Sequence, residues 1–282
     1  MTWYHELGIK YPLFQGGMAW ASNAELVAAV SNNGALGIIG SGGRTANELR
    51  RMIRKTKTLT SQPFGVNLML LDKNIKQLLE VICEEKISVV TTGAGSPKEI
   101  IDTIIANNIK LFPVVPNKDI ALKMLKLPIS GIIVEGNEAG GHVGSQNLAS
   151  LLKEIAPICP LPLIAAGGIY DQHTASLANI LGANGVQVGT AFLLAKECQI
   201  SPIYQELICK SEENGTSLIS DKNGHLTRLL NISSEHSSNK SLKAAVETGD
   251  LINGAFMAGS SSAYLEKIEP VETIIQRIMK NN

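Results

Sequence analysis

The sequence predicts an α/β fold, a (β/α)8 barrel (TIM barrel) with a small accessory segment inserted before its C-terminal helices. Short apolar runs rich in β-branched residues recur along the first 200 residues, each followed by glycine or asparagine and then by an amphipathic stretch. Successive runs begin 21 to 31 residues apart, which is the length of one strand, one helix and two short loops. Eight alternating units favour a closed barrel over an open doubly wound sheet.

The predicted strands share one pattern, an apolar run that ends in small or polar residues. They are PLFQGGMA from residue 12, LGIIGSG from 36, FGVNLMLL from 64, VVTTGAG from 89, KLFPVVP from 110, GIIVEG from 131, PLIAAGGI from 162 and GVQVGTAFLL from 185. A Rossmann fold is the structural alternative, and it needs an early glycine-rich turn with an acidic residue about 20 positions later. Here the turn GAGSP comes fourth and lacks the third glycine.

The stretches between these strands carry signals for the start of helices. Asn23 and Asp171 each stand as an N-cap before a helical pattern. A third helix is predicted to begin after Ser96, with Pro97 in its first position and Glu99 capping back. Alternating strands and helices imply a parallel sheet covered by helices.

The pattern changes after Leu194. Residues 201–249 are polar and lack clear strand periodicity, so they are predicted to form a small, shortened accessory segment on the substrate side. The barrel itself is predicted over residues 1–200 and 250–282, with closing helices in the tail.

Composition excludes several classes of function. Lys plus Arg and Asp plus Glu both number 25, so nothing indicates nucleic acid or an anionic membrane as a partner. No run of about 18 apolar residues predicts a transmembrane helix. The four cysteines lack metal-type spacing, so no metal site is predicted from them. Because the N-terminus also lacks an export signal, a reducing cytoplasm is the expected location.

Functional residues of such barrels gather at the carboxyl ends of the strands. Glycines are unusually frequent there, which indicates that the backbone itself approaches a large flat ligand. The glycines in question are Gly16, Gly17, Gly40, Gly42, Gly43, Gly93, Gly95, Gly140, Gly141, Gly167, Gly168 and Gly189.

The ends of the last two predicted strands indicate a phosphate site. Loops after the seventh and eighth strands bind phosphate in many barrels, and N–H groups at glycine turns favour an anion. Here AAGGI contributes Gly167 and Gly168, and VQVGT contributes Gly189 and the hydroxyl of Thr190. Either motif alone would be explained equally well by a tight turn, but the two occur in the expected order.

Polar side chains interrupt three of the apolar strands. Asn67, Glu135 and Gln187 each stand near the carboxyl end of a predicted strand. Buried amides and carboxyls need hydrogen-bond partners. The three converge only if a polar ligand lies across the barrel mouth; for Asn67, capping of the next loop is the alternative.

His142 is the candidate catalytic residue. It stands in EGNEAGGHVG, where the surrounding glycines predict a flexible loop on the active rim. A lone histidine is more often structural, but no core packing would hold one here. Since histidine exchanges protons near neutral pH, His142 is expected to transfer a proton or to orient a substrate.

Taken together, these motifs resemble the FMN-dependent enoyl-acyl-carrier-protein reductases of the FabK type, which share one barrel superfamily with the nitronate monooxygenases (2-nitropropane dioxygenases). The resemblance covers residues 10–200 in order and returns at 250–262. TTGAG followed by PVVP, with NLMLL after GVN, favours the reductase branch. The motifs are FQGGMAW, GVNLMLL, VVTTGAGSP, PVVP, EGNEAGGHVG, PLIAAGGI, GVQVGTAF and MAGSSS.

The resemblance implies an FMN stretched across the barrel mouth, with His142 matching the functional histidine of the family. Gln187 is also expected to contact the cofactor, because it stands near the carboxyl end of a predicted strand. The implied contacts are Gly16, Gly17 and Met18 at the flavin, Asn67 at its ring edge, Glu135 beneath it, Gly140 and Gly141 close to it, Ala166, Gly167, Gly168, Gly189 and Thr190 at the phosphate, and Met257, Ala258 and Gly259 closing over it.

The implied activity is the NAD(P)H-dependent reduction of trans-2-enoyl thioesters carried on acyl carrier protein, by a homodimer, with NADH or NADPH as electron donor. A monovalent cation site is a further feature of the family. The chain is shorter than most reductases of this type, and the loss falls in residues 210–250, which puts that cation site and the substrate entrance in question. The alternatives are a nitronate monooxygenase that uses O2 and a non-catalytic flavin-binding carrier or regulator.

Overall fold

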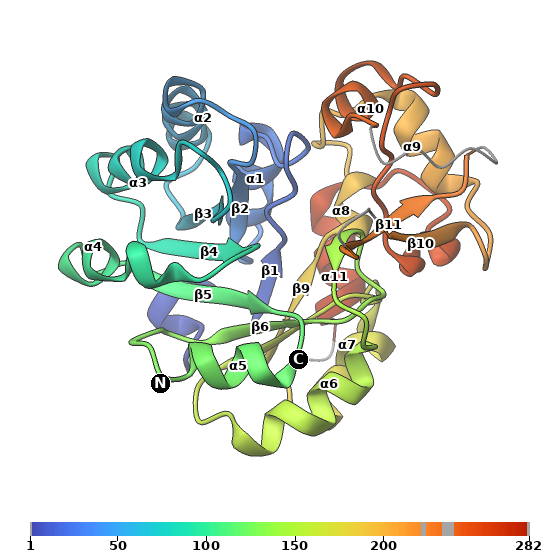
Figure 1. Cartoon of the computed structure of the whole chain (residues 1–282). Coiled ribbons are helices and arrows are strands. Elements are labelled where there is room, and N and C mark those ends of the chain that lie inside the picture. The colour runs from blue at the N-terminus through green and yellow to red at the C-terminus, as the bar shows by residue number, and fades with distance from the viewer. Residues whose placement is uncertain (1, 221–223, 233–239, 281–282) are drawn as a thin grey trace.

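The computed structural model describes residues 2–220, 224–232 and 240–280, and it has the predicted (β/α)8 architecture (Figure 1). Eight parallel strands form one sheet, and a bridge between Phe14 and Leu36 joins its two edges into a barrel. Around the barrel the strands are β1 (Leu13–Gln15), β2 (Gly37–Gly40), β3 (Phe64–Met69), β4 (Val89–Gly93), β5 (Lys110–Val115), β6 (Ile132–Glu135), β8 (Leu163–Ala166) and β9 (Gly185–Val188). All eight strands coincide with the apolar runs of the sequence.

A ring of helices surrounds this sheet. α11 packs against both α1 and α7, so the C-terminal helix closes the ring. The ring consists of α1 (Ala24–Asn32), α2 (Ala46–Leu59), α3 (Ile75–Glu84), α4 (Ile101–Ala106), α5 (Lys118–Met124), α6 (Leu148–Ile155), α7 (Gln172–Ile180) and α11 (Val271–Met279). The short helix α8 (Thr190–Leu193) follows β9, and the described helices include none with the length and hydropathy of a membrane span.

Two of the three predicted N-caps are confirmed. Asn23 accepts a hydrogen bond from the N–H of Leu26, and Asp171 forms a capping box with Thr174. Ser96 stands at an N-cap position directly before Pro97, as predicted, but no side-chain capping hydrogen bond forms there. The 3-10 turn η2 (Pro97–Glu99) precedes α4 and bonds its own backbone, with the N–H of Ile100 donating to the carbonyl of Pro97. Because Pro97 has no N–H group, the start of this turn has one fewer donor for a side chain to cap.

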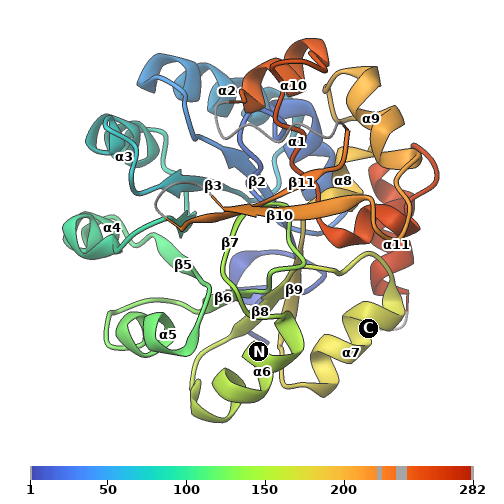
Figure 2. The ribbon, with the colours of Figure 1, turned by 45° about the vertical axis from the view of Figure 1, so that its right-hand side comes forward.

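The polar segment after the barrel contains strands that the sequence did not reveal. It comprises α9 (Pro202–Cys209), β10 (Thr216–Ser220), β11 (Leu226–Leu230) and α10 (Leu242–Thr248). β10, β11 and β7 (Gly141–Val143) form an antiparallel three-stranded sheet at the carboxyl ends of the barrel strands (Figure 2). Apolar residues fall on both faces of β10 and β11, so no period of two is visible in their sequence.

The barrel interior is apolar and is closed at its amino end. The inward-facing residues form one hydrophobic cluster that includes Phe14 and Phe112. Trp3, near the N-terminus, packs against both rings, with centroid distances of 5.8 and 6.2 Å. Its indole N–H donates to the carbonyl oxygen of Asn184. Ligands therefore reach the interior only from the opposite end, the mouth.

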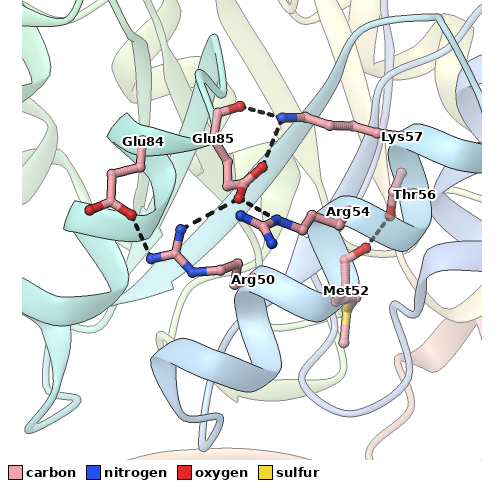
Figure 3. Close-up of polar contacts among 7 residues, drawn as sticks. All are labelled: Arg50, Met52, Arg54, Thr56, Lys57, Glu84 and Glu85. Carbon is pink, nitrogen blue, oxygen red and sulfur yellow. Dashed lines mark hydrogen bonds and ion pairs between the residues drawn. The ribbon is translucent and has the colours of Figure 1, made fainter.

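An ionic network joins the outer faces of α2 and α3 (Figure 3). Glu85 is 8% exposed and its carboxylate accepts from Arg54 at 2.8 Å and from Lys57 at 3.1 Å. Arg50 bridges Glu84 and Glu85, at 2.5 and 3.5 Å. Burial alone would raise the pKa of Glu85, but the hydrogen bonds from Arg54 and Lys57 hold it below its ordinary value.

We expect Glu85→Gln to lower the free energy of unfolding by about 1 to 2 kcal/mol at pH 7, because three cations lose their shared carboxylate. A lowered pKa means that the carboxylate stabilises the fold above pH 4.5 and that this contribution disappears as the acid protonates. The difference from wild type should therefore shrink below about pH 4. Urea denaturation across this pH range measures it, with Glu84→Gln, whose single pair is more exposed, as the control. An equal loss in both variants would contradict the central role of Glu85.

Candidate functional site

The mouth of the barrel is lined by a layer of polar side chains that face inward. Strand register places Asn67 between Gly40 and Thr91 on the neighbouring strands. On the other side of the barrel, Glu135 is in register with Ala166 and through it with Gln187. Glu135 lies two positions beyond the inward-facing Ile133. Gly65 and Gly185, two positions before Asn67 and Gln187, are in register with the inward-facing residues Ile38 and Ile164. Strand alternation therefore turns all three polar side chains into the barrel. The structure thus brings the three predicted polar residues to one level.

Several polar groups of this layer have no partner. The hydroxyl of Thr91 donates to Oδ1 of Asn67 at 2.9 Å, and the Asn67 amide N–H groups donate to no described residue. Among the described residues, the side chains of Glu135 and Gln187 make no hydrogen bond or ion pair. Burial raises the pKa of the Glu135 carboxyl to about 7. A half-buried layer whose hydrogen-bond donors and acceptors are unused is typical of a binding site for a polar ligand.

The first turn of the rim is organised by a residue that the sequence reasoning missed. Gln15 is fully buried, donates to Ser22 Oγ at 2.8 Å and accepts from the N–H of Ile38 at 3.1 Å. Ser22 Oγ in turn accepts from the N–H of Met18 at 2.8 Å. A polar residue inside the apolar run LFQ was the available signal. This network fixes the backbone of residues 16–18 at the mouth.

Gly17 could not carry a side chain in this turn. A Cβ atom there would lie 2.3 Å from Cβ of Asn67. The predicted residues Gly17 and Asn67 are therefore in direct contact. Gly16 lies beside Gln187, and its N–H donates to the carbonyl of Val188 on the neighbouring strand.

The predicted phosphate loops present free N–H groups. Gly167 and Gly168 have φ of +103° and +71°, a conformation that favours glycine. The N–H groups of these two residues and of Gly189 donate to no other described residue, and Gly189 is half-buried beside Met18. Such uncommitted N–H groups, two of them at consecutive positions, suit an anion.

Thr190 holds the C-terminal segment against the rim. Its Oγ1 accepts from the N–H of Gly259 at 2.9 Å, which the phosphate prediction had not anticipated. On the other side of this segment, a Cβ atom on Gly140 would lie 2.6 Å from the carbonyl carbon of Ala258. The segment Met257–Gly259 therefore lies between Thr190 and Gly140. A Cβ atom on the neighbouring Gly141 would lie 3.4 Å from the Met257 sulfur.

His142 lies beyond β6 as predicted, but on a strand instead of a loop. β7 pairs with β11, and this pairing sets His142 directly opposite Thr227. The imidazole is exposed, and its Nδ1 lies 3.1 Å from Oγ1 of Thr227. Within the described part of the chain, no three His, Cys, Asp or Glu side chains are grouped to hold a metal ion.

Comparison with known proteins places this arrangement in a family. The sequence model of the family described as Nitronate monooxygenase matches residues 3–79 and 73–281, nearly the whole chain. The chain belongs to the nitronate monooxygenase family. FabK from Thermotoga maritima is 38% identical, with a TM-score of 0.93 over 97% of this chain and 93% of FabK.

Two curated relatives show how varied the nitronate monooxygenase family is. A probable nitronate monooxygenase from Staphylococcus haemolyticus is 31% identical, over 81% of this chain and 79% of its own length. A (3aS,4S,5R,7aS)-5-hydroxy-7a-methyl-1-oxo-octahydro-1H-indene-4-carboxyl-CoA dehydrogenase from Rhodococcus jostii is 32% identical, over 83% of this chain and 67% of its own length. Members of the family are FMN-dependent oxidoreductases.

The mouth of this nitronate monooxygenase family member fits that cofactor. FMN has a planar ring with donor and acceptor edges and a phosphate at the end of a chain. The amide N–H groups of Asn67 and the side chains of Glu135 and Gln187 make no hydrogen bond among the described residues. A Cβ atom on Gly93 would find no atom within 4 Å. The free N–H groups of Gly167, Gly168 and Gly189 match the phosphate. Both halves of the ligand thus find unsatisfied groups of the right kind.

We expect Gly168→Ala to weaken FMN binding about 10-fold or more, because a displaced N–H would lose a hydrogen bond to a charged group. The left-handed φ should also cost about 1 kcal/mol of stability. Gly8→Ala is a matched control: its φ is +75°, and the nearest atom to an added Cβ lies 3.3 Å away in both cases. Gly8 lies near the closed end of the barrel, before β1. Flavin fluorescence titration and thermal denaturation measure the two effects, and equal FMN affinity in both variants would contradict the assignment.

The raised pKa of Glu135 predicts a pH-dependent stability. Its carboxyl has a pKa of about 7 in the folded protein and about 4.5 when unfolded. The folded state therefore holds the proton more tightly, and flavin-free protein loses stability as the pH rises from 4.5 to 7. Glu135→Gln escapes this loss, so it should exceed wild type by about 1 to 3 kcal/mol above pH 7 and match it below pH 4.5. Thermal denaturation from pH 4 to 8 measures the gap, and a gap that does not vary with pH would contradict the burial of this carboxyl.

Proposed function

We propose that this chain catalyses the FMN-dependent, NAD(P)H-using reduction of trans-2-enoyl thioesters, as an enoyl-acyl-carrier-protein reductase. The observation that carries the proposal is the 38% identity with FabK of Thermotoga maritima along nearly the whole of both chains. A coverage of 97% leaves room for most of the segment after the barrel, which includes the accessory hairpin formed by β10 and β11.

The thioester part of the proposal has separate support. The Rhodococcus jostii relative is named for a carboxyl-CoA compound, which is a thioester of coenzyme A. Its sequence aligns with 83% of this chain at 32% identity. A thioester carried on a protein or on coenzyme A therefore fits the proposed substrate class, with acyl carrier protein as the proposed carrier.

The cofactor residues supply binding and orientation. When bound, FMN supplies the hydride chemistry that the protein side chains lack. The amides of Asn67 and Gln187 would hold the ring edges, and the N–H groups of Gly167, Gly168 and Gly189 would bind the phosphate. The Met257–Gly259 segment and the turn at Gly16–Met18 would exclude water from the mouth.

The proposed role of His142 is proton transfer. Saturation of the double bond adds one hydride equivalent from NAD(P)H at Cβ and one proton at Cα of the thioester. His142 would donate that proton at Cα, because it is the exposed imidazole on the strand that follows β6. General acids of this kind contribute about 10²- to 10⁴-fold to a rate.

A nitronate monooxygenase is the second candidate, favoured by the family match and by the Staphylococcus relatives. In that reaction His142 would act on the nitroalkane or nitronate, and O2 would be the oxidant. The two candidates differ in their need for NAD(P)H. Anaerobic mixing of the flavin-loaded protein with NADH or NADPH, followed by an enoyl thioester, should bleach and then restore the flavin absorbance. Absence of bleaching together with turnover of nitronates would establish the second candidate.

We expect His142→Ala to retain FMN and to lose about 10²-fold or more in the rate of enoyl reduction, because the proton donor is removed. The reduction of the flavin by NAD(P)H should persist, since that step needs no imidazole. Stopped-flow measurement of each half-reaction with crotonyl or longer enoyl thioesters separates the two. His225→Ala, at the position immediately before β11, is the control for the loss of a histidine from this region. Full enoyl turnover by the His142 variant would remove this residue from the mechanism.

A further inference from the structure

We infer that Thr227, on the accessory hairpin, is a positioning residue that fixes the ring orientation and tautomer of His142. The inference rests on the proposed function, in which Nε2 of His142 serves the substrate. It starts from one contact, the 3.1 Å between Thr227 Oγ1 and His142 Nδ1. This contact joins residues 85 positions apart in the sequence.

His142 has little else to hold it. Its side chain is exposed, and the hydrogen bond to Thr227 is its one side-chain contact of this kind among the described residues. β7 pairs with β11 and with no other described strand. The preceding residue, Gly141, has a φ of +85°, so the backbone before the histidine is in a conformation open mainly to glycine. The accessory hairpin therefore decides where the imidazole lies.

The hairpin is itself clamped in register. Arg228, next to Thr227, donates from Nε to the carbonyl oxygen of Asn137 at 2.7 Å and from Nη1 to Thr216 Oγ1 at 3.0 Å. Asn137 lies in the same loop that leads to His142. The arginine thus ties β11 to both β10 and the β6–β7 loop. A slip of one residue would turn Thr227 to the other face, and this clamp opposes it.

Thr227 is suited to select one nitrogen of the ring. Its hydroxyl can donate to an unprotonated Nδ1 or accept from Nδ1–H, and it makes no other hydrogen bond among the described residues. Donation leaves the proton of neutral His142 on Nε2, whereas acceptance would leave it on Nδ1. We take the hydroxyl as the donor, because its hydrogen has no other acceptor among the described residues. A β-branched side chain has few χ1 rotamers, so the hydroxyl direction is well defined. Nε2–H is then the donor left for the ligand.

The test compares Thr227→Val, Thr227→Ser and Ser217→Ala in the flavin-loaded protein. Valine keeps the shape and the β propensity but removes the hydroxyl, whereas serine keeps the hydroxyl. Ser217 lies on β10, on the same sheet face as Thr227, and makes no side-chain hydrogen bond to His142, so it controls for loss of a hairpin hydroxyl. Nitrogen-15 NMR of histidine-labelled protein reports the tautomer, and the resonance absent from His142→Ala assigns the residue.

We expect wild type, Thr227→Ser and Ser217→Ala to show His142 mainly as the Nε2–H tautomer and Thr227→Val to show a mixture. The kcat for enoyl thioester reduction should fall about 3- to 10-fold in Thr227→Val, as for the loss of one hydrogen bond, and recover in Thr227→Ser. Flavin reduction by NAD(P)H should be the same in all four proteins. If Thr227→Val folds poorly, Thr227→Ala carries the same expectation.

An unchanged tautomer in Thr227→Val, or a serine variant as impaired as valine, would overturn the inference. The NMR measurement needs no substrate, so it separates this inference from the proposed function. A tautomer shift in a protein that reduces no enoyl thioester would support the role of Thr227 while rejecting the substrate class. An unchanged tautomer in an active enoyl reductase would support the substrate class and reject the role of Thr227.

Discussion

A closed barrel admits side chains to its interior only at alternate positions of each strand, and this constraint shapes the whole site. Lower in the barrel the inward positions are apolar, as at Phe14, Ile38, Val89, Ile133 and Ile164. One layer higher they become polar or very small. Polar groups in that upper layer cannot all satisfy one another across the barrel. The interior therefore ends in unpaired amides and a carboxyl, which a bound ligand would satisfy.

The closed amino end makes this upper layer the only route into the barrel. Trp3 and its aromatic neighbours fill the bottom. At the mouth, by contrast, four separate parts of the chain meet: the first rim turn, the β6–β7 loop, the accessory hairpin and the Met257–Gly259 segment. Glycines at 17, 140 and 259 allow these backbones to approach one another closely. The site is thus assembled from tertiary contacts on a rigid scaffold, as is common in this fold.

Features that serve the site reduce stability locally. Glu135 is half-buried and has no partner among the described residues, and Gly167 and Gly168 hold left-handed conformations. The outside of the barrel offsets such costs with helices packed in a closed ring and with shared ion pairs such as those of Glu85. Strain and unsatisfied groups concentrated at one end, with well-packed structure elsewhere, are typical of enzymes. The strand β7, which carries His142, also lies at the mouth, and its position depends on its pairing with β11 and not on the barrel sheet.

The sequence by itself determined the barrel, its eight strands, and the level at which Asn67, Glu135 and Gln187 meet. These follow from local periodicity and from the fixed geometry of parallel strands, which bring residues near strand ends to one rim. The strand at His142 and its partner at Thr227 were decided only by tertiary structure. A three-residue strand such as β7 has no period of its own, and its partner β11 lies 85 residues away along the chain. The buried network of Gln15 was also hidden, because one polar residue in an apolar run does not reveal which backbone groups it will bind.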